Sequence, residues 1–213
     1  MKRVLYIAAQ REGYGIDQIR HTMTVRDLIK SVVIASANDA AVALAEHTYG
    51  SEEAFVKRMN ERAAELGMTA THFENTNGLD DTAQNHVTSA GDIAIMSREL
   101  IRHKEILEFS STWMDTIRNG QFGLTNTNRL VRFYRGCNGL KTGSTAKAGF
   151  CVSVTAERDG MTLICVIMGA ETRDIRNAEA TRLLDWGFAT YGLFHQDGGS
   201  LPPLPVTGGR LDA

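Results

Sequence analysis

Two short segments carry side chains whose types and spacing could act on a peptide. Ser36-Ala37-Asn38 offers a hydroxyl and an amide, and Lys141-Thr142-Gly143 offers a cation, a second hydroxyl and a glycine. In an extended tripeptide the first and third side chains point the same way, so we expect Ser36 and Asn38 to be presented together. Lys141 and Thr142 would place a positive charge and a donor beside an anionic group. These residue types favour recognition of an extended peptide with an anionic end.

The lysine lies in a predicted strand, Gly139-Leu140-Lys141-Thr142-Gly143-Ser144. A glycine inside a strand often marks a place where another backbone comes close. A peptide that lies along a strand edge gains main-chain hydrogen bonds. The alternative is an ordinary edge strand whose lysine opposes aggregation. The corresponding alternative for the first segment is an asparagine that caps a helix.

Helical periodicity extends from residue 24 to residue 109. Thr24 and Asp27 have capping-box spacing, and an apolar stripe at i, i+3, i+4, i+7 and i+8 follows. Residues 68–88 are expected to form a loop, because Asn, Gly and Asp are frequent there. The other expected helices cover residues 40–47, 51–67, 89–103 and 104–109.

The pattern then changes to that of strands. Residues 113–117 alternate weakly, and residues 150–157 alternate clearly before an Asp159-Gly160 turn. The return strand, residues 161–168, is apolar at nearly every position, so we expect it to be central and covered on both faces. A last helix, residues 172–191, should cover the sheet with Arg176 on its inward stripe. Such an arginine needs an anionic ligand or a structural acid, and both readings stay open.

The sequence therefore predicts an α+β protein, with a mainly helical lobe and an antiparallel sheet covered by a C-terminal helix. A cleft is expected where the two parts meet. We expect residues 22–191 to form one domain. Residues 1–21 are unassigned, and residues 192–213, with their Gly and Pro, are read as a linker or frayed tail.

Composition sets limits on function. The chain has 213 residues, of which 43% are hydrophobic and 23% charged, with a net charge of -2. This charge gives no reason to expect nucleic acid or an anionic membrane as a partner. The histidines are scattered and no CxxC pair occurs, so no metal or other cofactor is expected. The apolar run after Met1 is too short for a signal peptide, and we expect no targeting segment.

Together these motifs resemble a known family. Ser-x-Asn and Lys-Thr-Gly are the second and third motifs of penicillin-binding proteins and serine β-lactamases. The neighbourhood of the motifs is similar to that of the D-alanyl-D-alanine carboxypeptidases, the low-molecular-weight penicillin-binding proteins, over residues 22–190. The segments that carry this resemblance are Thr24-Val25-Arg26-Asp27-Leu28, Ser36-Ala37-Asn38-Asp39-Ala40, Asn77-Gly78-Leu79-Asp80, Asn128-Arg129-Leu130, Gly139-Leu140-Lys141-Thr142-Gly143 and Ala148-Gly149-Phe150.

The resemblance implies a β-lactamase/transpeptidase-like fold and a serine peptidase that removes the terminal D-alanine from peptidoglycan stem pentapeptides. It implies β-lactam antibiotics as ligands and a place in the cell envelope, outside the cytoplasm. Ser36 would relay protons and Asn38 would hold the substrate amide. Lys141 and Thr142 would bind the terminal carboxylate, beside Gly143, and Arg176 is a second candidate for that carboxylate. The N–H of Ser144 would be an oxyanion donor.

The first motif of that family, Ser-x-x-Lys, holds the nucleophile and its base on one helical turn. In this sequence the spacing occurs only at Ser144 and Lys147, in or beside the predicted strand, where positions i and i+3 face opposite ways. Ser36 has no lysine or histidine at close sequence spacing. Three readings stay open: a truncated enzyme, a relative that binds peptidoglycan peptides without catalysis, or an unrelated α+β binding domain.

Overall fold

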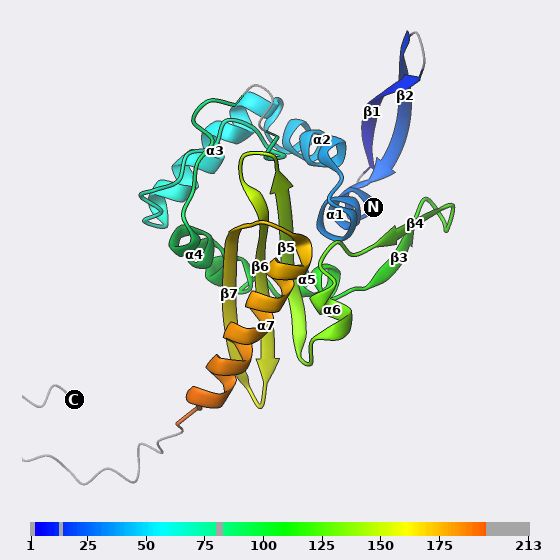
Figure 1. The fold of residues 1–213 in the computed structure, drawn as a ribbon. Coiled ribbons are helices and arrows are strands. Elements are labelled where there is room, and N and C mark those ends of the chain that lie inside the picture. The colour runs from blue at the N-terminus through cyan, green and yellow to red at the C-terminus, as the bar shows by residue number, and fades with distance from the viewer. Residues whose placement is uncertain (1–2, 13–14, 80–82, 195–213) are drawn as a thin grey trace, which may run out of the picture.

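The computed structural model describes residues 3–12, 15–79 and 83–194 (Figure 1). An antiparallel sheet of three strands, in the order β5-β6-β7, lies between helix α7 and the helical part of the chain. These strands are β5 (Cys137–Thr145), β6 (Gly149–Arg158) and β7 (Met161–Ala170), and the helix is α7 (Arg173–Thr190). The predicted α+β layout is confirmed.

The helical part contains α1 (Val25–Ala35), α2 (Asn38–Tyr49), α3 (Glu52–Glu65), α4 (Ala90–Leu100) and α5 (Lys104–Ser110). Side-chain caps begin several of these helices where the sequence predicts them. Thr24 accepts a hydrogen bond from the N–H of Asp27 at 3.0 Å, and Ser89 accepts one from Asp92 at 3.1 Å. A side-chain acceptor at this position satisfies one of the N–H groups that a helix start leaves unpaired.

Two apolar clusters form the core. One joins α1, α2 and the hairpin formed by β3 (Met114–Ile117) and β4 (Phe122–Thr125). The other lies between the sheet and α7, where Val152 and Val154 of β6 pack with Ala180 and Leu184. Ser153, which faces the opposite side of β6, shares a 2.7 Å hydrogen bond with Ser97 of α4. The alternation predicted for residues 150–157 therefore separates the two layers that cover the sheet.

Strand β7 differs from its prediction. We expected residues 161–168 to be central, but β6 is the central strand and β7 lies at one end of the β5-β6-β7 order. Cys165 is the one residue of β7 that is buried, and Met168 is 39% exposed. The strand does contact α7 and α4, one on each side, which explains its apolar pattern. Apolar residues on both faces indicate that both faces are covered by other elements. They do not show whether the hydrogen-bonding edge of the strand is paired.

Four further elements were not assigned from the sequence. β1 (Arg3–Glu12) and β2 (Gly15–Thr24) form a hairpin in the segment left unassigned, and β2 runs across the boundary placed at residue 22. α6 (Leu130–Phe133) is one short turn. β3 (Met114–Ile117) was expected, and it pairs with β4 (Phe122–Thr125). Most of the predicted tail, residues 195–213, lies outside the described residues, and none of the helices described is long and apolar enough to cross a membrane.

Candidate functional site

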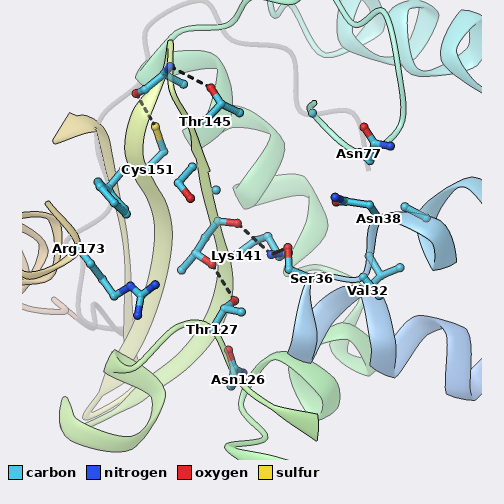
Figure 2. Close-up of a pocket in the computed structure, with 18 of the residues that line it drawn as sticks. Val32, Ser36, Asn38, Asn77, Asn126, Thr127, Lys141, Thr145, Cys151 and Arg173 are labelled. Carbon is cyan, nitrogen blue, oxygen red and sulfur yellow. Dashed lines mark hydrogen bonds between the residues drawn. The ribbon is translucent and has the colours of Figure 1, made fainter. Parts of the chain in front are cut away.

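Ser36 lies at the junction between α1 and α2. It ends α1 in the left-handed conformation, with φ 61° and ψ 40°. Ala37 is extended and Asn38 is already the first residue of α2, so neither the expected extended tripeptide nor its alternative, an asparagine that caps a helix, is found. The sharp turn at Ser36 nevertheless places the Ser36 and Asn38 side chains in one cleft (Figure 2).

Lys141 of β5 meets Ser36 across a sequence separation of 105 residues. Its Nζ donates to Ser36 Oγ at 2.7 Å and to the carbonyl oxygen of Thr142 at 2.9 Å (Figure 2). Burial, reinforced by the charge of Arg176, lowers the pKa of Lys141 to about 8. An ammonium group with that pKa can give up and regain a proton near neutral pH. Ser36, which lacks a basic neighbour in sequence, therefore has one in space.

The loop between β4 and α6 holds α1 and β5 together, and this role was not predicted. The N–H of Thr127 donates to the carbonyl of Ile34 in the last turn of α1 at 3.1 Å. The Thr127 hydroxyl lies 2.7 Å from the hydroxyl of Thr142 on β5. One residue thus connects the end of α1, which carries Ser36, with the strand that carries Lys141.

Two buried asparagines fix the same loop. Asn126 Nδ2 donates to the carbonyls of Ser110 and Thr112, at 3.1 and 2.9 Å. Its Oδ1 accepts from the N–H of Asn128, whose side-chain amide donates to the carbonyl of Gly139 at 3.3 Å. Buried amides that satisfy their hydrogen bonds in this way specify one backbone path. Asn128 was noted only as part of a family-like segment, and nothing in its local sequence indicates this role.

The outer edge of β5 borders the cleft. β5 is the end strand of its sheet, and the predicted neighbours of Lys141 lie along it. No described atom lies within 4 Å of the position that a Cβ at Gly143 would occupy, and Gly143 and Ser144 are exposed. A second backbone can therefore approach β5 at Gly143, as strand addition requires. Whether the Ser144 N–H serves as an oxyanion donor stays a prediction.

Arg176 is buried, with 3% of its surface exposed, although it lines the cleft. Its guanidinium donates to Asn177 Oδ1 at 2.9 and 3.1 Å and to the carbonyl of Cys151 at 3.4 Å. Burial, followed by the nearby charge of Arg173, lowers its pKa. No carboxylate of the described residues forms an ion pair with it. The structural acid that one reading required is thus not found there, which favours an anionic ligand.

The cleft has a volume of about 820 Å³ and runs between the two parts of the molecule. Asn38 and Asn77 face each other on one side of it, and Arg173 lies on the opposite side (Figure 2). All seven predicted site residues line this cleft. They are Ser36, Asn38, Lys141, Thr142, Gly143, Ser144 and Arg176. The described residues include no group of three or more His, Cys, Asp or Glu side chains placed to hold a metal ion.

Comparisons with a family profile and with known sequences give the same family. The profile of the Peptidase_S11 family, described as D-alanyl-D-alanine carboxypeptidase, matches residues 8–172. The D-alanyl-D-alanine carboxypeptidase DacF of Bacillus subtilis is 46% identical over 172 residues, and DacC of Escherichia coli is 38% identical over 167. These alignments cover 79% and 78% of this chain, but only 44% and 41% of the two relatives. The chain thus spans less than half of their length.

Solved structures show the same fold. Penicillin-binding protein D2 of Listeria monocytogenes, in its ampicillin-bound form, superposes with a TM-score of 0.77 at 36% identity, over 88% of this chain and 76% of that one. Penicillin-binding protein 6B of Escherichia coli gives a TM-score of 0.73 at 38% identity, over 79% of this chain and 53% of that one. The penicillin-binding protein fold expected from the motifs is confirmed.

Proposed function

Because the chain belongs to the D-alanyl-D-alanine carboxypeptidase family, we propose that it forms the substrate-binding and proton-transfer part of a serine-type carboxypeptidase. The substrate is a peptidoglycan stem peptide that ends in D-Ala-D-Ala, and β-lactams occupy the same cleft. This activity belongs in the cell envelope, in cell-wall synthesis and the maintenance of cell shape. The observation that carries the proposal is the 2.7 Å hydrogen bond between Lys141 and Ser36 in a cleft open to an extended peptide.

The peptide lies along the free edge of β5. Its terminal carboxylate accepts a hydrogen bond from the Thr142 hydroxyl and pairs with Lys141 and Arg176, which have no carboxylate partner among the described residues. The open space at Gly143 admits the peptide backbone, and the N–H of Ser144 stabilises negative charge on the scissile carbonyl oxygen. Asn38 holds the substrate amide from the other wall of the cleft.

Ser36 and Lys141 move protons. The Ser36 hydroxyl accepts a hydrogen bond from Lys141 Nζ and can donate its own proton to the leaving amine, after which Lys141 restores it. A lysine pKa of about 8 lowers the free-energy cost of this exchange near neutral pH. In a protein that also supplies a nucleophile, Lys141→Ala should reduce the rate about a hundredfold or more, as loss of a transition-state charge contact does.

A second candidate function is binding without turnover. The single Ser-x-x-Lys spacing of the 213-residue sequence is Ser144 to Lys147. Ser144 lies in β5, and Lys147 lies in the turn before β6. The two residues do not share a helical turn, which is the arrangement that lets a lysine activate a serine nucleophile. This observation favours a chain that binds peptides or penicillins reversibly.

Fluorescent penicillin separates the two functions. We expect the 213-residue chain to bind it by fluorescence anisotropy, to release it in denaturant, and to liberate no D-alanine from a pentapeptide. Lys141→Met should weaken binding, whereas Lys104→Met, a matched change of an exposed lysine at the start of α5, should not. A denaturant-stable adduct on Ser36 or Ser144 would contradict our assignment of roles. Absence of any binding would contradict the proposed site itself.

A further inference from the structure

The cleft holds one cation that is neither assigned to the ligand nor held by another side chain. Four of its described lining residues are cationic and none is Asp or Glu. Lys141 and Arg176 are assigned above to the terminal carboxylate of the peptide. The guanidinium of Arg129 stacks on Phe133, 5.6 Å from the ring centroid. The fourth cation is Arg173, and its presence in the cleft needs an explanation.

The position of Arg173 is electrostatically unfavourable. It is the first residue of α7, where the partial positive charge of the helix N-terminus opposes a cation. Arg176 follows three positions later, and like charges at this spacing destabilise a helix. Among the described residues Arg173 forms no ion pair, whereas Arg182, exposed on the same helix, pairs with Glu179. An uncompensated charge that opposes folding is typical of a functional site.

The sheet presents Thr142 on the side from which Arg173 approaches. Thr142 pairs with Val152 across β5 and β6, and directly opposite residues of an antiparallel pair share a face. Val152 packs against α7, so the Thr142 side chain lies on the α7 face of the sheet. Arg176 reaches the same region, because it donates to the carbonyl of Cys151 at 3.4 Å. Arg173 lies one helical turn earlier, and its guanidinium points into the cleft (Figure 2).

A carboxylate bound at Thr142 can accept more hydrogen bonds than its assigned partners fill. Its two oxygens offer about four acceptor sites, and the Thr142 hydroxyl occupies one. Three of the five N–H groups of Arg176 already donate to oxygen atoms of the protein. The hydrogen bonds within the described residues use none of the donors of Arg173, which is exposed. Its planar donor groups are suited to a carboxylate.

We propose that Arg173 is a specificity-determining residue, which donates to the terminal carboxylate of the bound peptide together with Arg176. The site then prefers a peptide with a free terminal carboxylate over the same peptide with a terminal amide. This inference rests on the proposed function, because that function places the carboxylate at Thr142. Since Arg173 is exposed, we expect it to contribute about threefold to fivefold to the preference at low salt, and less at high salt.

A matched pair of ligands tests this role: an N-acetylated peptide that ends in D-Ala-D-Ala, prepared as the free acid and as the terminal amide. Calorimetry measures the affinity of each for the 213-residue chain at low and high salt. In Arg173→Gln at low salt the ratio of the two affinities should fall about threefold to fivefold, because the acid alone binds more weakly.

Two control variants each remove one positive charge. Arg129→Gln removes a cation from the same cleft, and Arg182→Gln removes one from the same helix but outside the cleft. In both, the ratio should change by less than about twofold. Urea unfolding of Arg173→Gln should give a midpoint at or above that of the wild type, because the change removes an unfavourable cation.

The outcomes separate this inference from the proposed function. If the acid binds and Arg173→Gln keeps the wild-type ratio, the role of Arg173 is wrong and the proposed function stands. An equal fall in Arg129→Gln would assign the preference to the charge of the whole cleft and would also overturn that role. A fall that comes with a lower urea midpoint would show that Arg173 supports the fold instead. If neither peptide binds, the proposed function and this inference fail together.

Discussion

Lys141 should destabilise the folded chain at neutral pH, and its replacement should therefore stabilise it. The pKa of this lysine falls from 10.5 to about 8. The difference of 2.5 pH units corresponds to about 3.4 kcal/mol, at about 1.36 kcal/mol per unit. Lys141→Met removes this penalty together with two hydrogen bonds of about 1 kcal/mol each, to Ser36 and Thr142. We expect the variant to be about 1–2 kcal/mol more stable at pH 7.

The sign of the pH dependence of stability follows from the lowered pKa of Lys141. Between pH 8 and 10.5 the unfolded chain holds the lysine proton and the folded chain does not, so the contribution of Lys141 to stability rises with pH. Below pH 8 both states are protonated and the penalty is constant. The advantage of Lys141→Met should therefore be largest below pH 8, fall to about zero near pH 9, and reverse at higher pH.

Urea unfolding of the wild type and Lys141→Met at pH 7, 8, 9 and 10 measures this difference. Cys137 and Cys165, whose thiol pKa values burial raises to about 11, also titrate in this range, but their effect cancels between the two proteins. Lys104→Met serves as the control and should show a difference near zero at each pH. A Lys141→Met advantage that is absent at pH 7, or that does not change from pH 7 to pH 10, would refute the burial argument.

Three further predictions follow from the same contacts. A bound carboxylate should raise the Lys141 pKa again, so ligand binding at pH 9 should take up about one proton, measurable by calorimetry in buffers of different ionisation enthalpy. Gly139→Ala should destabilise by about 1–3 kcal/mol, since its Cβ would lie 2.5 Å from Ser110 Oγ, whereas Gly143→Ala should leave stability nearly unchanged and weaken peptide binding. The chain should associate through β7, because its outer edge has no partner strand among the described residues. α7, which packs against β7, adds exposed apolar surface at Trp186, which is 57% exposed. A single monomer boundary in sedimentation at all concentrations would disprove this association.

Local signals predicted most of the elements. The caps at Thr24 and Ser89 begin helices as expected, and the Asp159-Gly160 turn, with φ of 50° and 79°, joins β6 to β7. Such features depend on residues close in sequence, and so they can be read from it. The hairpin β1–β2 lacked a clear apolar alternation in its second strand. The helix α6 is too short for any periodicity to appear.

The position of β7 could not be predicted for a different reason. Its residues are apolar on both faces because α4 and α7 cover it, and this pattern does not depend on whether a strand lies beyond its edge. Side-chain patterns report the environment of the two faces of a strand. Edge pairing involves only backbone groups, and every residue carries these groups except that proline lacks the N–H.

The basic partner of Ser36 also could not be predicted from local sequence. Sequence identified Ser36 and Lys141 and placed both in one cleft, yet it gave Ser36 no basic partner. That partner exists because Thr127 ties the last turn of α1 to β5, through one backbone and one side-chain hydrogen bond. The lowered pKa of Lys141 likewise comes from burial between the two parts of the molecule. Since neither property belongs to a motif, a chain could keep Ser-x-Asn and Lys-Thr-Gly and still lose the proton-transfer pair, if the loop at Thr127 no longer held the two together.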